Sequence, residues 1–160
     1  MMTVAILTVS DGVSSGHRED LSKTAIEESI RDMECEILYR AVVPDEKDKI
    51  AGKLKEWCDG YRVDLVLTTG GTGFAPRDVT PEATRIVLER EAPGLGEAMR
   101  AATLARVPTS MLSRATAGMR GKTLIVNLPG SPKACRECLE VIVPVLPHAI
   151  SLLKGETGQH

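Results

Sequence analysis

The stretch VDLVLTTGGTG, residues 63–73, decides the fold. Its first part, 63–68, is an apolar run of the kind found in strands that are buried on both faces of a parallel sheet. The run leads directly into a turn, 69–73, in which three of five residues are glycine. In open α/β sheets, ligands bind beyond the carboxyl ends of the strands. We therefore expect a buried central strand that ends at a binding loop.

Strands and helices alternate on both sides of this stretch. Apolar runs predict further strands at 3–10, 35–43, 112–120 and 123–128. Apolar residues at helical spacing predict helices within 21–33, 50–58, 81–92, 95–107 and 132–154. The polar segment 11–16 is expected to be a loop. Alternating strands and helices predict an α/β fold, a single three-layer domain with a mostly parallel central sheet flanked by helices on both faces. The domain should span 1–155, and the tail 156–160 should be frayed.

Several helix starts are marked by capping residues. Asp20 and Ser131 are placed to cap the helices that follow them, and Pro132 suits a first helical position. Thr80 is expected to be the N-cap of the next helix, with Pro81 as its first residue. That helix should direct three apolar side chains inward, namely Ala83, Ile86 and Val87.

Composition narrows the possible functions. The chain has 160 residues, 42% hydrophobic and 26% charged, which is typical of a folded globular domain. Its formal net charge is −2 and only 2% of its residues are aromatic, which argues against nucleic acid and anionic membranes as partners. The N-terminal segment lacks the basic region of a signal peptide, so a cytoplasmic location is expected.

The four cysteines are expected to be reduced and to pack as small apolar residues. Cys135 and Cys138 form a C-x-x-C pair, which also suggests a redox or zinc site. Zinc would need two further ligands, and a redox cysteine would lie nearer the start of the helix. Packing is therefore the favoured interpretation.

The glycine-rich turn 69–73 suits a phosphate group. Glycines permit positive φ angles, so successive backbone N–H groups can form an anion-binding nest. The spacing matches neither a P-loop nor a dinucleotide fingerprint. A tight turn that needs glycine for geometry alone is the alternative. The loops at 10–16 and 127–133 follow other strands, and the second leads into a helix N-terminus that favours anions.

Two carboxylates accompany these loops. Asp45 follows a strand that ends at Pro44, and a simple helix-capping role is the alternative for it. Asp78 lies just before Thr80, which already serves as the expected cap. Mg²⁺ binds one or two carboxylates together with phosphate oxygens, so both residues are candidate ligands.

Four segments in one order and spacing, at 68–73, 76–83, 112–115 and 127–133, resemble a known family. They are similar to the Mog-type and MoaB-type proteins of molybdenum cofactor biosynthesis, which include the G domain of gephyrin. The resemblance extends from about Thr3 to Gly155. The Thr-Gly-Gly-Thr-Gly loop alone also occurs in molybdenum insertases and competence-damage-type proteins.

The resemblance implies a molybdopterin adenylyltransferase, which converts ATP and molybdopterin to adenylylated molybdopterin and pyrophosphate with Mg²⁺. It implies that Asp45 and Asp78 are the catalytic residues and the Mg²⁺ ligands. The substrate-binding residues that it implies are Asp11, Thr69, Gly70, Gly71, Thr72, Gly73, Ser113, Asn127, Pro129, Gly130 and Ser131.

The resemblance also implies a homotrimer or hexamer that hands its product to a separate insertase, since the chain carries no fused insertase domain. Two alternatives remain open at this point. One is a pterin-binding carrier oligomer without catalysis, and the other is a nucleotide pyrophosphatase of the competence-damage type.

Overall fold

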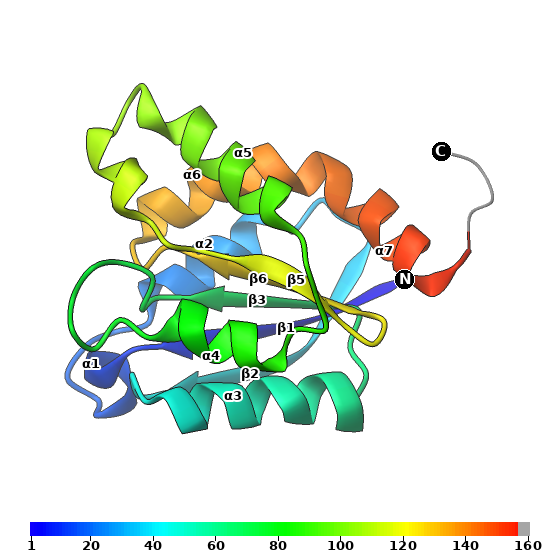
Figure 1. Ribbon diagram of the computed structural model, residues 1–160, viewed down its shortest axis with the longest axis horizontal. Coiled ribbons are helices and arrows are strands. Elements are labelled where there is room, and N and C mark those ends of the chain that lie inside the picture. The colour runs from blue at the N-terminus through cyan, green and yellow to red at the C-terminus, as the bar shows by residue number, and fades with distance from the viewer. Residues whose placement is uncertain (157–160) are drawn as a thin grey trace.

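Parallel strands form the centre of the sheet in the computed structural model, which describes residues 1–156 (Figure 1). Within these residues the sheet has six strands in the order β2-β1-β3-β6-β5-β4. The strands are β1 Met2–Val9, β2 Cys35–Val43, β3 Leu65–Thr69, β4 Arg90–Glu91, β5 Ala117–Arg120 and β6 Thr123–Leu128. Strands β2, β1, β3 and β6 are parallel, whereas β5 is antiparallel to both of its neighbours. The predicted mostly parallel sheet is confirmed.

Helices cover both faces of this sheet, which confirms the three-layer α/β prediction (Figure 1). One face is covered by α2 Leu21–Ser29, α5 Pro93–Leu104, α6 Pro132–Ile142 and α7 Leu146–Lys154. The other is covered by α3 Lys47–Lys55, its π-helical continuation Glu56–Gly60, and α4 Thr80–Val87. The short helix α1 Asp11–Ser14 follows β1.

Strand β3 lies in the middle of the hydrophobic core, as its sequence predicts. All five of its residues are buried. Leu65 and Leu67 pack toward α2 and α6, whereas Val66 packs on the opposite side with Leu54 of α3. At the sheet edge, β2 instead alternates between half-buried and exposed residues. The central strand therefore fixes the layers, and its carboxyl end leads into the glycine-rich turn.

Three segments differ from their predicted structure. The expected loop 11–16 begins with helix α1, because the hydroxyl of Ser10 accepts a hydrogen bond from Val13 N and caps it. The expected strand 112–120 is shorter, since a 3₁₀ helix, Pro108–Leu112, precedes it and only 117–120 pairs with β6. The helix expected within 81–92 ends at Val87, and Arg90–Glu91 form the strand β4 instead, because they pair with Met119 and Gly118 of β5.

Helix α4 directs a different set of side chains inward from the one predicted. Ala83 and Val87 are buried, but the Ile86 side chain is 54% exposed. Thr84 takes the inward position instead, because its hydroxyl accepts a hydrogen bond from Asn127 Nδ2 on β6. A buried polar contact thus sets the rotation of this helix.

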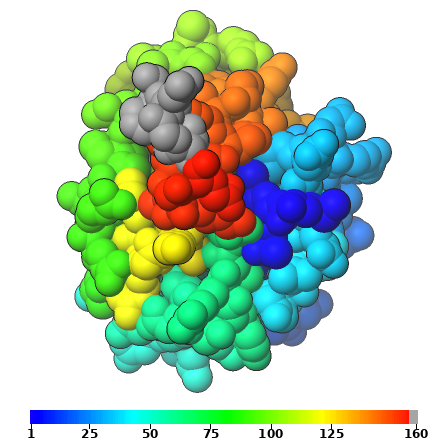
Figure 2. Space-filling view, turned by 90° about the vertical axis from the view of Figure 1, so that its right-hand side faces the viewer, coloured from blue at the N-terminus to red at the C-terminus, as the bar shows by residue number. Residues whose placement is uncertain are grey.

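The amino ends of the parallel strands β1, β2, β3 and β6 lie at the end of the molecule opposite the loops that follow them. Figure 2 shows the start of the chain beside α7 at this end. Asp64 ties the two together, since it accepts a hydrogen bond from Thr3 N and lies 3.2 Å from Lys154 Nζ. The predicted tail 156–160 lies outside the described residues except for Glu156. Over 1–156, no helix combines the length and the apolar character needed to cross a membrane.

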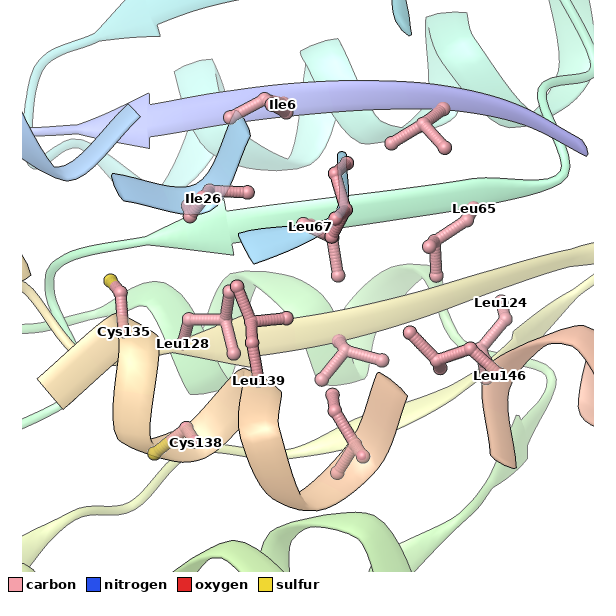
Figure 3. Close-up of a cluster of buried hydrophobic side chains, with 14 of the residues drawn as sticks. Ile6, Ile26, Leu65, Leu67, Leu124, Leu128, Cys135, Cys138, Leu139 and Leu146 are labelled. Atoms are coloured by element: carbon pink, nitrogen blue, oxygen red, sulfur yellow. The ribbon is translucent and has the colours of Figure 1, made fainter. Parts of the chain in front are cut away.

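The C-x-x-C cysteines pack in the core, as predicted. Cys135 and Cys138 lie beside Leu128 and Leu139, on the inner side of α6 (Figure 3). The Cys135 thiol donates a hydrogen bond to the carbonyl of Pro129 at 3.1 Å. Burial raises the pKa of each of these two thiols to about 11. Both are therefore neutral at pH 7 and poorly suited to redox chemistry.

We predict that iodoacetamide modifies Cys135 and Cys138 slowly in the folded protein at pH 7, because it reacts with thiolates. The partly exposed Cys35 is the internal control and should react faster. Unfolding should bring all three to similar rates. Mass spectrometry of timed digests measures this, and rapid modification of Cys135 in the native protein would contradict the packing role.

Candidate functional site

The carboxyl ends of the parallel strands and the loops that follow them enclose two cavities. The first has a volume of about 270 Å³ and is lined by the end of β1, by Gly70, Gly71 and Gly130, and by Asp45 and Asp78. The second has a volume of about 390 Å³ and is lined by α5, the segment 107–115 and the start of α6. The loop 129–131 separates them, since Gly130 borders the first while Pro129 and Ser131 border the second.

Two glycines in the turn are required by their surroundings. Gly70 has φ +100°, and a Cβ on it would lie 2.2 Å from the carbonyl oxygen of Val9. Gly71 has φ +69°, and its Cβ would lie 2.3 Å from Thr80 Oγ1. Both contacts are too short for any other residue. The turn thus needs glycine for its geometry, and it also lines the first cavity.

Thr80 holds this turn and does not act as the predicted N-cap. It is the first residue of α4, and Val79 occupies the cap position. The Thr80 hydroxyl donates to the carbonyl of Gly70 at 2.9 Å, and its backbone N–H donates to Gly71 O. The reason for the difference is tertiary, because the hydroxyl donates to the Gly70 carbonyl and does not accept from the N–H groups of its own helix.

Three predicted substrate-binding residues are buried. The side chain of Asn127 is fully buried, and its Nδ2 donates to Thr68 Oγ1 and Thr84 Oγ1. Thr69 lines the first cavity, but its hydroxyl donates to Pro129 O at 2.6 Å. Thr72 is buried as well. The structure uses the Asn127 and Thr69 side chains to join strand ends and loops, and it does not bring Asn127 to either cavity.

Asp45 and Asp11 hold each other in place at the rim of the first cavity. The backbone N–H of Asp11 donates to Asp45 Oδ2 at 2.9 Å, and that of Asp45 donates to Asp11 Oδ1 at 3.0 Å. Glu46, not Asp45, occupies the N-cap of α3, and its side chain caps no N–H group. The capping interpretation of Asp45 is therefore wrong.

Negative charge accumulates around Asp45. Burial raises the pKa of its carboxyl group, and the charges of Asp11 and Asp78 raise it further. Arg77 forms an ion pair with Asp11, with its Nε 2.6 Å from Asp11 Oδ2, and this hydrogen bond lowers the pKa of Asp11. Three neighbouring carboxylates thus have one guanidinium among them. A bound cation would relieve the remaining repulsion.

Asp78 is held by its own loop. Its Oδ2 accepts a hydrogen bond from Ala75 N at 3.0 Å, and its backbone N–H donates to Ala75 O. The carboxylate lines the first cavity together with Asp45. In residues 1–156, no three His, Cys, Asp or Glu side chains form a metal-binding group by themselves. The two aspartates fit Mg²⁺ only when phosphate oxygens or water complete its ligands, which is how this ion usually binds.

The second cavity is mostly apolar. Met99, Leu112 and Phe74 contribute to its lining, and the Phe74 side chain is 69% exposed. Among the predicted residues, Gly73, Ser113, Pro129 and Ser131 border it. The Ser131 hydroxyl is used to cap α6. Neither Phe74 nor Arg100 was singled out from the sequence. Phe74 could have been, because it is an aromatic residue directly after the glycine-rich turn.

The chain matches an established family over most of its length. The family described as "Probable molybdopterin binding domain" matches residues 5–148. A "Molybdopterin adenylyltransferase" of Helicobacter pylori is 49% identical over 158 residues, which is 98% of this chain and 90% of the relative.

Solved structures give the same result. The molybdopterin biosynthesis enzyme MoaB from Thermus thermophilus has a TM-score of 0.94 and 52% identity, covering 99% of this chain and 100% of its own. The molybdopterin biosynthesis Mog protein from Mycobacterium ulcerans has a TM-score of 0.88 and 38% identity, covering 96% and 99%. By its match over nearly its whole length, this chain belongs to the molybdopterin-binding domain family of molybdenum cofactor biosynthesis.

Proposed function

We propose that the protein is a molybdopterin adenylyltransferase, which transfers AMP from ATP to molybdopterin and releases pyrophosphate. The supporting observation is the pair of cavities on either side of the loop 129–131. The glycine-rich turn contributes to both, and Asp45 and Asp78 lie in the first. Two phosphate-bearing substrates can thus place their reacting groups at one junction, and such positioning is the main contribution of proteins to this chemistry.

The reaction requires two negatively charged groups to approach each other. Residues of this chain can offset the repulsion between them. Backbone N–H groups at 71–73 orient phosphate oxygens, as nests of this kind do, while that of Gly70 is already used by Leu128 O. Asp45 and Asp78 would hold Mg²⁺, which supplies positive charge against the polyphosphate. Arg77 lies on the same loop as Asp78. Its ion pair with Asp11 is exposed to solvent, so its guanidinium is free to bind a substrate phosphate in place of Asp11. No nucleophilic side chain is required.

The proposal extends to the surroundings of the enzyme. We assign the protein to the cytoplasm, where its four free thiols remain reduced. We also propose that it forms a trimer or hexamer and passes adenylylated molybdopterin to a separate insertase. Light scattering coupled to size-exclusion chromatography measures the assembly directly.

The reaction is tested by incubating the protein with molybdopterin, ATP and Mg²⁺. We expect adenylylated pterin and pyrophosphate in equal amounts, and no product after chelation of Mg²⁺ with EDTA. AMP formed from ATP without pterin would instead identify a nucleotide pyrophosphatase. Pterin binding without any adenylylation would identify a carrier.

We predict that Asp45→Asn and Asp78→Asn each lower kcat by a factor on the order of 10² or more, which is ~3 kcal/mol of transition-state stabilisation. Asparagine keeps an oxygen that can accept the hydrogen bonds from Asp11 N and Ala75 N, so the melting temperature should change little. Asp32→Asn, an exposed carboxylate away from both cavities, is the control. Near-normal kcat in both site variants would assign Asp45 and Asp78 to loop ordering.

We also predict that Gly71→Ala weakens nucleotide binding by about tenfold or more, which corresponds to the ~1–2 kcal/mol penalty of a left-handed alanine. The new methyl group would also push against Thr80 Oγ1. Gly52→Ala is the matched control, because nothing lies within 4 Å of its Cβ and α3 favours alanine over glycine. Calorimetric titration with ATP measures both. Equal affinities would show that the turn does not bind the nucleotide.

A further inference from the structure

Arg114 connects parts of the protein that lie far apart in the sequence. It is half-buried, in the irregular segment between the 3₁₀ helix Pro108–Leu112 and β5. Its Nε donates to Gly73 O at 2.8 Å and its Nη2 donates to Asp78 O at 2.8 Å. Its Nη1 donates to Glu82 Oε2 at 2.5 Å. The three nitrogens of this planar guanidinium thus donate hydrogen bonds to three different residues.

These contacts hold both ends of one loop. Gly73 and Asp78 bound the segment 73–78, which contains no helix or strand and carries Phe74 and Arg77. The backbone N–H of Arg114 also donates to Thr72 O at 2.8 Å. Because Glu82 lies in the first turn of α4, the same guanidinium ties the loop to that helix. The position of the Asp78 carboxylate therefore depends on Arg114.

The first part of the turn is held independently. Gly70 N donates to Leu128 O, and the Thr80 hydroxyl donates to Gly70 O. Neither bond involves Arg114. Loss of the guanidinium should therefore release 73–78 while it leaves Gly70 and Gly71 in place.

The segment that carries Arg114 is itself fixed to the wall of the second cavity. Arg100 on α5 donates through Nη1 to Ser113 O at 3.2 Å and to Ala115 O at 2.9 Å. Ser113 and Arg100 line that cavity. From the same segment, the Arg114 side chain binds the loop 73–78, which carries Asp78. It thus joins the walls of the two cavities by direct hydrogen bonds.

We propose that Arg114 is a positioning residue, which holds Asp78 and the loop 73–78 in their working arrangement and couples them to the Ser113 wall of the second cavity. The effect on turnover rests on the proposed adenylyltransferase function. The effect on the loop does not, because it follows from the hydrogen bonds alone.

Arg120 provides a matched control. It is also half-buried, with a side chain 24% exposed against 31% for Arg114. Its guanidinium likewise binds a carboxylate, that of Asp59, and a backbone carbonyl, that of Val87. It borders neither cavity. Arg120→Met therefore removes similar interactions without touching the site.

The experiment compares Arg114→Met, Arg114→Lys and Arg120→Met with the unaltered protein. We expect Arg114→Met to lower kcat on the order of 10²-fold, as small misplacements of reacting groups do. ATP affinity should stay within a factor of about three, because each tenfold change needs ~1.4 kcal/mol and Gly70 and Gly71 remain held. Lysine keeps the charge but not the planar fork, so Arg114→Lys should recover only part of kcat. Arg120→Met should lose similar thermal stability but keep its turnover.

Amide hydrogen exchange gives a measurement that needs no turnover. The N–H groups of Ala75 and Asp78 are hydrogen-bonded within the loop, so they should exchange faster in Arg114→Met, while those of β3 should not. Unchanged exchange at these two amides would overturn the proposal whatever the activity. If the unaltered protein forms no adenylylated pterin, the proposed function fails, and exchange still decides the role of Arg114.

Chemical rescue distinguishes positioning from a general loss of folding. Guanidinium ion, below the concentration that unfolds the variant, should restore part of kcat to Arg114→Ala, because it can bind the same carbonyls and Glu82. Urea at the same concentration should not. Equal effects of guanidinium and urea, or rescue of neither kcat nor loop exchange, would contradict the positioning role.

Discussion

The site depends on the close approach of the backbone at Gly70 to the end of β1. A Cβ at this position would lie 2.2 Å from Val9 O, so the chain can turn there only without a side chain. On its other side, Gly70 donates its N–H to Leu128 O at the end of β6. One residue thus brings the carboxyl ends of three neighbouring strands together. The first cavity and the loop 129–131 follow from that junction.

A buried polar network supports this junction from below. Asn127 donates to Thr68 and Thr84 and accepts from Thr116 N, so both polar atoms of its amide have partners. No buried side-chain nitrogen or oxygen in residues 1–156 lacks a hydrogen-bond partner. Leaving such a group without its partner costs about 1–3 kcal/mol, so the network specifies one rotation of α4 against the sheet. The rotation of α4 in turn sets the position of the loop 73–78, which precedes this helix and carries Asp78.

The charges of the candidate site are unequal, because three carboxylates lie near one guanidinium. Asp11, Asp45 and Asp78 lie together with Arg77, and burial, together with the charges of the other two carboxylates, raises the pKa of Asp45. In the proposed function, a divalent cation would relieve this repulsion, and backbone N–H groups of the turn would donate to phosphate oxygens. The proposal therefore implies that a cation and a polyphosphate bind together more tightly than either alone.

The sequence by itself was enough to predict the layers, the buried central strand and the glycine-rich turn. It also singled out Asp45 and Asp78 as candidate Mg²⁺ ligands. These features depend on local pattern, since apolar runs, glycine spacing and the Ser131-Pro132 helix start can be recognised within a few residues. Only the tertiary structure decided that Thr80 binds Gly70, that Asn127 is buried, and that Arg114 holds the loop of Asp78. The hydrogen bond from Asn127 to Thr68 joins residues 59 positions apart, and that from Arg114 to Gly73 joins residues 41 positions apart. A polar side chain bonds to whichever partner the folded chain brings within about 3 Å, and no local pattern contains that information.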